Sequence, residues 1–271
     1  MKFLFTSSVF ALSALASSHA ATLISDSFGG MTSGSGLPGR TPEVSNAGGA
    51  WSGSTANLLS DGAGALRVGV LGGYFSEWAG PQARRAVEIA AQALGAAGVV
   101  ELKGAEQARA AAFVITAAEG GALHRRRLVT HYDYYEPLSR DRLVAGSLVP
   151  AAWTQHAQRI RHRVYREALA LYEDYDVLIA PATPVAAPPV GTDWLTLAGR
   201  QLPARASMGI LTQPISCIGL PVCTAPTWPR TGQDDHLPLG VQLIGAPWRE
   251  ADCLRAALVL EQAGAARALP L

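Results

Sequence analysis

The pattern of apolar and polar residues changes near Leu66, after which the chain shows the periodicity of a folded α/β domain. Residues 66–71 are mostly apolar and lead into paired glycines, which predicts a buried strand. Pro81 then opens a segment with apolar residues at helical spacing, and residues 99–102 return to a strand pattern. A strand, a helix and a strand so close together predict a parallel pair joined by a right-handed crossover.

Two long helices are expected next, over residues 105–128 and 139–172. They are separated by the turn-rich segment 131–137, and the second is interrupted at Pro150. Apolar residues at helical spacing predict that one face of the second helix packs on the core. These residues are Trp153, Ala157, Ile160, Val164, Ala168 and Leu171.

Three continuous apolar runs, residues 177–180, 218–224 and 239–244, predict strands in the last third of the chain. Such runs are typical of strands that are covered on both faces of a sheet. A closing helix is expected over residues 249–262, with Glu250 near its positive N-terminal end. The predicted fold class is therefore α/β, with a mixed β-sheet and helices on both faces.

The first twenty residues have the pattern of a secretory signal. Lys2 is followed by an apolar stretch from Phe3 to Ala16, and residues 18–20 have the small-x-small form of a cleavage site. The apolar stretch is too short to span a bilayer as a helix. We therefore expect residues 1–20 to be a signal peptide and the protein to be secreted or periplasmic.

Residues 21–65 form a separate segment of different composition. Glycine and serine fill 17 of the 41 positions from 22 to 62, and short apolar pieces alternate with turn-forming residues. The segment resembles the opening strands of secreted domains of the lectin or laminin-G kind, although it has too few strands to close a sandwich. A partial β-module and a flexible secreted linker are both open interpretations.

Charge and side-chain chemistry argue against several classes of function. The net charge of +1 gives no reason to expect nucleic acid or an anionic membrane as a partner. The six histidines have no metal-ligand spacing with a carboxylate or a cysteine, so no metal site is predicted. No phosphate loop, dinucleotide fingerprint or G-x-S-x-G elbow occurs, and no cofactor is expected.

Motifs in the last third of the chain resemble one known family. They read DVLIAPATP at residues 176–184, TQPISCIGLPVCTAP at 212–226 and LPLGVQLIGAPWREADCLRAALVLEQ at 237–262. In this order they resemble the C-terminal part of the amidase signature family, whose members hydrolyse amide and other C–N bonds. The resemblance covers residues 66–271, is nearest to carboxybiuret and ureido-acid amidases, and implies an amidase signature fold that is incomplete in this chain.

The family's reaction depends on a Ser–Ser–Lys triad, which lies in the other half of the family's domain. A lysine can act as a base only when it is neutral, and this requires burial that lowers its pKa. The chain has only two lysines: Lys2 lies within the predicted signal, and Lys103 follows a predicted strand with no serine near it in sequence. No catalytic residue is therefore assigned, and the fragment is expected to be inactive alone.

The resemblance implies a substrate-binding side at Tyr132, Arg140 and Arg142. The surrounding sequence is similar to the family's P-x-x-R-x-R-L-x-x-G segment, where an arginine and a nearby tyrosine hold a substrate carboxylate. A guanidinium group can bind a carboxylate through two parallel hydrogen bonds, and a phenol adds a donor. The alternative is that one of the arginines forms an ordinary surface ion pair with Glu136 or Asp141.

The glycine at position 209 narrows the class of substrate that is expected. In the glutamine-dependent tRNA amidotransferases of the family, an aspartate before the T-x-P motif holds the substrate amino group, and the corresponding residue here is Gly209. An α-amino substrate is therefore disfavoured, and a small carboxylate- or amide-bearing molecule is expected. Related members often work beside a small accessory subunit, which the resemblance implies as a partner.

Other classes of function stay open. One is a secreted, non-enzymatic binding module built on residues 22–62, and another is a pseudoenzyme that keeps a carboxylate pocket. The resemblance to amidases alone suggests the cytoplasm, which fits poorly with a secretory signal. A natural fusion, a truncation and an artificial join of unrelated sequences are therefore further interpretations.

Overall fold

The structure is a computed structural model that describes residues 24–25, 44–45, 66–229 and 236–267. The chain divides into two compact units, residues 1–60 and 61–271. In the first unit, the described residues form an antiparallel pair of two-residue strands, β1 (Ile24–Ser25) and β2 (Val44–Ser45).

The predicted signal at residues 1–20 and most of the segment 21–65 lie outside the described residues. Both assignments stay predictions, and so does the domain boundary expected at Leu66. Among the helices that are described, none is long and apolar enough to cross a membrane. The described His, Cys, Asp and Glu side chains likewise form no group of three or more that is placed to hold a metal ion.

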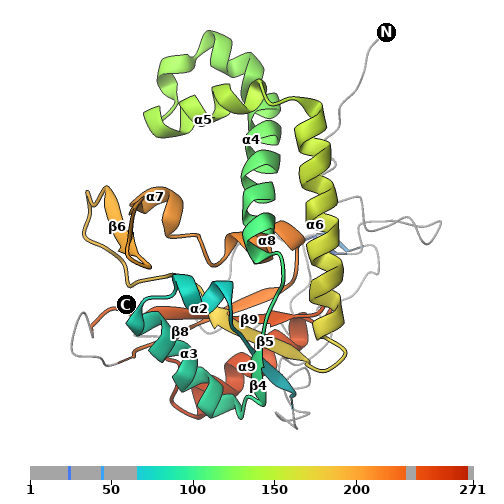
Figure 1. Cartoon of the computed structure of the whole chain (residues 1–271), viewed down its shortest axis with the longest axis vertical. Helices are drawn as coiled ribbons and strands as arrows, with labels where there is room; N and C mark the ends of the chain where they lie inside the picture. Colours follow the sequence, from blue (N-terminus) through green and yellow to red (C-terminus); the bar gives the residue numbers. More distant parts are fainter. Residues whose placement is uncertain (1–23, 26–43, 46–65, 230–235, 268–271) are drawn as a thin grey trace, which may run out of the picture. The chain divides into compact units, whose positions relative to one another are not determined.

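The second unit is built on a five-stranded mixed sheet (Figure 1). Across the sheet the strands are β4 (Gly98–Val100), β3 (Val68–Leu71), β5 (Val177–Pro181), β9 (Leu239–Gly245) and β8 (Val222–Thr227). β3 pairs in parallel with β4 and β5, whereas β9 is antiparallel to both of its neighbours. The predicted mixed α/β architecture is therefore confirmed.

Helices cover the sheet from both sides in Figure 1. α3 (Pro81–Leu94) joins β3 to β4, with a proline in its first turn and Gly95 ending it in the left-handed conformation at φ 62°. α3 follows the short helix α2 (Tyr74–Trp78) and packs beside the closing helix α9 (Glu250–Gln262). α8 (Gln213–Ile218) lies on the opposite side of the sheet.

The strand predicted over residues 218–224 is partly wrong. Ile218 is the last residue of α8, and the strand begins only at Val222. The helix is set by Pro214 in its first turn and by Gly219, which has a φ of 73° and ends the helix. Its apolar residues are buried as a helix rather than a strand, so the apolar run alone could not distinguish the two.

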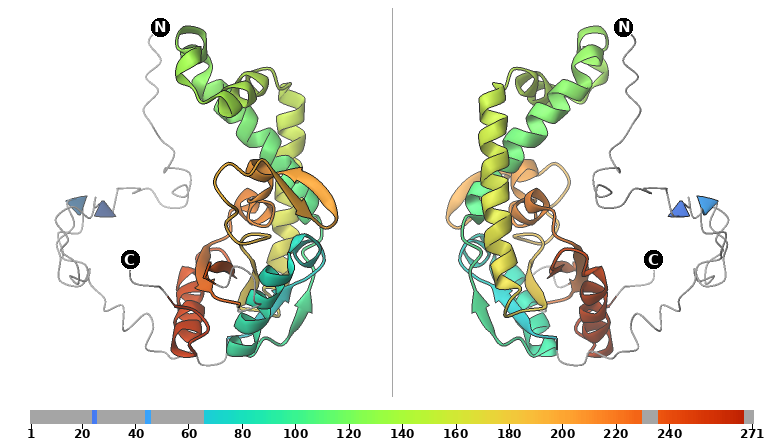
Figure 2. Two further views of the ribbon diagram at one scale, coloured as in Figure 1. Left: turned by 90° about the vertical axis from the view of Figure 1, so that its left-hand side faces the viewer. Right: turned by 90° about the vertical axis from the view of Figure 1, so that its right-hand side faces the viewer.

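Three helices form an arm that projects from the sheet (Figures 1 and 2). They are α4 (Ala105–Thr130), α5 (Pro137–Ser147) and α6 (Ala151–Leu171), with a short 3-10 helix, η1 (Tyr132–Tyr134), between the first two. The predicted helices and the break at Pro150 are therefore confirmed. The backbones of α4 and α5 approach closely at Gly121 and Gly146, where a β-carbon would meet the backbone of the facing helix.

The predicted apolar stripe of α6 is correct except at its start. Ala157, Val164 and Ala168 are buried, whereas Trp153 is 64% exposed. Trp153 lies in the first turn of α6, where a shallow groove is lined on the α4 side only by Ala110, Ala111 and Val114. These small side chains do not reach far enough to cover the indole.

A small hairpin stands beside the arm and ends in a one-turn helix (Figure 1). Its strands are β6 (Trp194–Leu197) and β7 (Arg200–Pro203), paired antiparallel, and α7 (Ala204–Ser207) follows directly. The tight turn between the strands places Ala198 and Gly199 at positive φ. The hairpin matters for the site because it carries Arg205 towards α5.

The two central strands, β5 and β9, are almost entirely buried. Gln242 of β9 is the one polar side chain in them, at 1% exposure. Its Nε2 donates hydrogen bonds to the carbonyl oxygens of Pro181, at 2.9 Å, and Leu211, at 3.1 Å. Because Leu211 comes just before α8, this amide fixes the position of α8 relative to the sheet.

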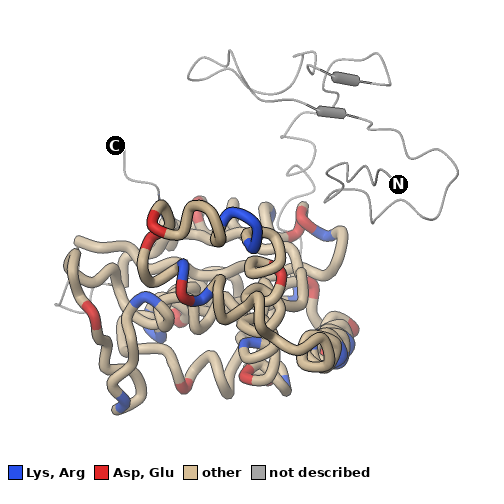
Figure 3. The backbone as a smooth tube through the Cα atoms, turned by 90° about the horizontal axis from the view of Figure 1, so that it is seen from above, with Lys and Arg blue, Asp and Glu red and all other residues tan. Residues whose placement is uncertain are grey.

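Basic and acidic residues are interspersed over the described elements (Figure 3). The best-connected ion pair joins the residues that precede β3 and β5. Asp176 accepts hydrogen bonds from the backbone N–H of Arg67 at 2.9 Å and from its Nη2 and Nε at 2.9 and 3.3 Å. These hydrogen bonds from Arg67 hold the pKa of Asp176 below its ordinary value. The pair therefore fixes the register of the two parallel strands.

We expect Asp176→Asn to lower the thermal midpoint at neutral pH, by an amount that shrinks in acid. The folded-state pKa of Asp176 is depressed, so its contribution is complete above the unfolded value of about 3.9 and is lost as the pH falls through the folded value. Melting both proteins between pH 7 and pH 3, with Asp193→Asn as an exposed control, measures the difference. A gap that stays constant with pH would contradict the assignment.

Gly121→Ala is expected to destabilise the arm, although alanine favours helix. The added β-carbon would overlap the backbone at Gly146 and Ser147, so α4 and α5 must move apart at a cost of about 1–3 kcal/mol. Gly120→Ala is the matched control, because its β-carbon meets only the end of the Leu143 side chain and gains up to about 1 kcal/mol of helix propensity. Urea unfolding followed by circular dichroism compares them, and equal stabilities would refute the prediction.

Candidate functional site

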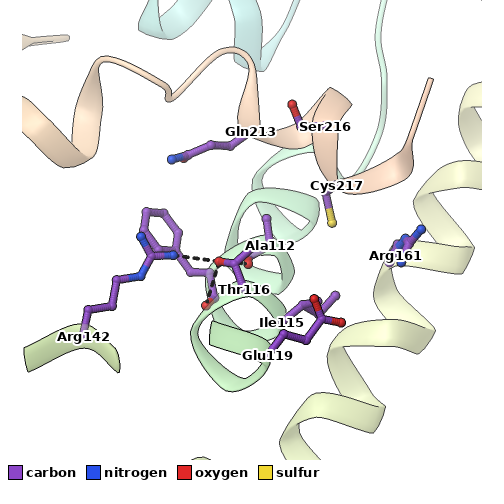
Figure 4. A pocket seen from close by; sticks show the side chains of 10 residues that line it. Ala112, Ile115, Thr116, Glu119, Arg142, Arg161, Gln213, Ser216 and Cys217 are labelled. Atoms are coloured by element: carbon purple, nitrogen blue, oxygen red, sulfur yellow. Dashed lines mark hydrogen bonds between the residues drawn. The ribbon is translucent and has the colours of Figure 1, made fainter. Parts of the chain in front are cut away.

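A cavity of about 490 Å³ opens between the arm and α8 (Figure 4). Helices α4, α5, α6 and α8 each contribute side chains to its wall. The lining residues are Ala112, Phe113, Ile115, Thr116, Glu119, Arg142, Arg161, Gln213, Ser216 and Cys217. This volume is within the usual range of small-molecule sites, and the wall combines apolar groups with a few polar ones, as such sites do.

Arg142 is held at one side of the cavity by α4. Its Nη2 donates a 2.7 Å hydrogen bond to Thr116 Oγ1, and its guanidinium carbon lies 5.1 Å from the centre of the Phe113 ring. Among the described residues, no carboxylate lies within ion-pair distance of Arg142. The cavity therefore contains an oriented cation whose remaining donors are available to an anion.

Arg140 and Tyr132 form a separate group outside the cavity lining. The Arg140 guanidinium lies 4.5 Å from the Tyr132 ring centre and within ion-pair distance of Asp133, at 3.6 Å, and Asp141, at 3.9 Å. Tyr132 donates its hydroxyl to Asp141 at 3.0 Å. Residues two positions apart project from different sides of a helix, so α5 separates the two predicted arginines. Of the three predicted site residues, only Arg142 lines the cavity.

The start of α5 is held by a carboxylate cap. Glu136 accepts hydrogen bonds from the backbone N–H groups of Leu138, at 3.2 Å, and Ser139, at 2.8 Å. Arg205 from α7 pairs with Glu136 at 2.9 Å and donates to Ser139 Oγ at 3.0 Å. Hydrogen bonds from Ser139 and Arg205 lower the pKa of Glu136 to about 2. This cap keeps α5, and with it Arg142, in a fixed orientation.

Gln213 forms the opposite part of the wall, on α8. Its Oε1 accepts a 2.8 Å hydrogen bond from Arg109 Nε, which connects α8 to α4. A β-carbon at Gly209 would lie 3.3 Å from Gln213 Nε2. A side chain at position 209 would therefore point towards a cavity residue, and in this chain glycine leaves that space without a carboxylate.

The remaining lining residues were not predicted from the sequence. The sequence gives no sign that Thr116, Glu119 and Arg161 are more than surface residues of two helices. They line one cavity only because α4 packs against α6 and α8. Cys217 also lines the cavity, but burial raises the pKa of its thiol, so it is not an activated nucleophile. No signal in the sequence alone identified these positions.

Lys103 does not belong to the cavity. It lies in the turn between β4 and α4, where its side chain is exposed to solvent. A lysine that serves as a base must be buried, and Lys103 is exposed. The cavity wall therefore contains polar and charged groups, and no lysine is among its lining residues.

Proteins of known sequence are similar to most of this chain. AtzE of Pseudomonas sp. (strain ADP), a 1-carboxybiuret hydrolase subunit, is 55% identical over 211 residues, which are 78% of this chain and 46% of that protein. A glutamyl-tRNA(Gln) amidotransferase protein of Lachnospira eligens is 27% identical over 240 residues, covering 78% of this chain and 48% of that protein. The chain thus spans about half the length of these relatives.

Solved structures likewise match most of this chain and about half of the other chain. One is a vestigial protein complex that reveals the evolutionary origins of an s-triazine catabolic enzyme, matched with a TM-score of 0.75, 53% identity and coverage of 78% of this chain and 46% of that one. A 6-aminohexanoate cyclic dimer hydrolase has a TM-score of 0.63 at 23% identity, covering 77% of this chain and 47% of that one, which shows a likeness of fold alone.

A family model described as amidase matches residues 45–254. The match covers well over half of the chain and agrees with the mixed sheet, the flanking helices and the motifs at β5, α8 and β9. The chain therefore belongs to the amidase signature family of hydrolases.

Proposed function

We propose that the cavity binds a small carboxylate-bearing amide or ureido compound, as the substrate-binding half of an amide hydrolase. The observation that carries the proposal is Arg142, an oriented guanidinium in the cavity without a carboxylate partner among the described residues. Charge-assisted hydrogen bonds from a guanidinium to a carboxylate are among the strongest polar contacts in proteins. The relative at 55% identity is a 1-carboxybiuret hydrolase subunit, whose name fits this class of ligand.

Hydrolysis is proposed to need residues that this chain does not contribute to the cavity. The chain spans about half the length of its relatives, and its only lysine in the described part is exposed in a turn away from the cavity. The proposal also includes a partner, a small accessory subunit, since the related 1-carboxybiuret hydrolase protein is itself one subunit of its enzyme. In this proposal the chain by itself is a binding unit without turnover.

The first expectation concerns affinity. Arg142→Ala should weaken binding of malonate or a ureido acid by about tenfold, because charge-assisted hydrogen bonds contribute roughly 1.5–3 kcal/mol before desolvation. Arg140→Ala is the matched variant: its guanidinium is already paired with two aspartates and lies outside the cavity lining, so the effect should be smaller. Calorimetry or NMR titration measures both. Equal affinities for the parent and Arg142→Ala would dispose of the proposal.

The second expectation concerns catalysis. The purified chain should release no ammonia from biuret-type or simple aliphatic amides above the rate in buffer, since residual rates without a triad come only from binding and oxyanion contacts. A coupled ammonia assay at several pH values provides the measurement, with Lys103→Ala as the diagnostic variant. Turnover by the parent chain that disappears in Lys103→Ala would show that a lysine of this chain is catalytic.

A further inference from the structure

We propose that Glu119 and Arg161 form a second recognition point in the cavity, which selects an amide or ureido group at the far end of the ligand. The inference rests on the proposed function, in which Arg142 holds the ligand carboxylate. It names the residues that recognise the amide or ureido group of that ligand, and so assigns specificity to two residues outside the family's carboxylate motif.

The geometry places the two residues across the cavity from Arg142. Glu119 comes from α4 and Arg161 from α6, whereas Arg142 comes from α5. In Figure 4, Arg142 stands at the left of the cavity and Arg161 at the right, with Glu119 below. A ligand that spans the cavity from Arg142 therefore meets this pair with its other end.

Both side chains have hydrogen-bonding capacity that the described residues leave unused. Arg161 donates one hydrogen bond, at 3.3 Å from its Nη1 to Gln158 Oε1. Within the described part of the chain, Glu119 has no hydrogen bond, and neither residue has an oppositely charged partner within 4.0 Å. A carboxylate has only acceptors and a guanidinium only donors, so together the two side chains offer an acceptor group and a donor group to a ligand.

An amide or ureido group is the chemical complement of this pair. Its N–H groups can donate to Glu119, and its carbonyl oxygen can accept from Arg161. A second carboxylate would be attracted by Arg161 but repelled by Glu119. An alkyl end would form no hydrogen bond with either residue, and both are exposed, so water would continue to solvate them. The pair therefore favours an amide or ureido end through direct contacts and disfavours a carboxylate end through the charge of Glu119.

The rest of the wall is consistent with a short ligand. Ala112, Ile115 and Cys217 are small or apolar, and they lie along the cavity between its polar groups. A volume of about 490 Å³ has room for a chain of a few atoms between two polar ends, together with some water. Three ligands of matched shape can therefore test the end group alone.

The test uses 3-ureidopropionate, glutarate and 5-methylhexanoate, which share a carboxylate and a spacer and end in a ureido, carboxylate or isopropyl group. Binding to the parent chain is measured by isothermal titration calorimetry at neutral pH and fixed ionic strength. We expect 3-ureidopropionate to bind about tenfold more tightly than either of the others, the scale of one or two charge-assisted hydrogen bonds.

The diagnostic variant is Glu119→Gln. It should weaken 3-ureidopropionate several-fold and strengthen glutarate, because the repelling charge is removed while the shape is kept. Arg161→Gln should weaken both of these ligands and leave 5-methylhexanoate unchanged. Glu106→Gln, on the same helix and outside the cavity lining, is the matched control and should change none of the three affinities. A purely structural effect would change the two affinities in the same direction.

The outcomes separate this inference from the proposed function. If the three ligands bind equally and all depend on Arg142, the carboxylate site stands and the role of Glu119 and Arg161 is refuted. If Glu119→Gln changes all three affinities by the same factor, the inference also falls. If no ligand binds, or binding is insensitive to Arg142→Ala, both the proposed function and this inference are overturned.

Discussion

Strands β5 and β9 lie side by side in the middle of the sheet and present no face to water, and this burial determines how the surrounding elements are placed. Every residue of β5 is buried, and β9 has only Gly240 partly accessible. Helices must therefore cover both sides. The single buried amide in this pair of strands, Gln242, meets its hydrogen-bonding requirement by contacting the backbone that leads into α8. The same contact that satisfies the core thus positions one wall of the cavity.

The site depends on a second set of contacts, which orient the arm. α4 and α5 meet through glycines whose hydrogen atoms leave room for close backbone approach, and α5 is capped by Glu136. Arg205 ties that cap to the hairpin that precedes α8. Arg142 reaches the cavity because α5 is fixed at both its start and its packing face. Stability of the arm and geometry of the site are consequently carried by the same residues.

The chain spans about half the length of its relatives, and two features of the structure are consistent with that. The edges of the described sheet are β4 and β8, and Val99 of β4 is 73% exposed. The cavity is lined by Arg142, Glu119 and Arg161, and no lysine is among its lining residues. Both features fit a chain whose relatives are about twice as long.

The sequence by itself determined the mixed α/β class, most helices and strands and the family, because apolar periodicity, Pro81, Gly95 and the ordered motifs are local signals. Tertiary structure decided which polar residues share a cavity. Arg140 and Arg142 are equivalent in a motif, but a 3.6-residue helix turns them to different sides, one towards aspartates and one towards Thr116. Likewise, Glu119 and Arg161 line one cavity only because α4 packs against α6, and no local pattern in the sequence records that contact.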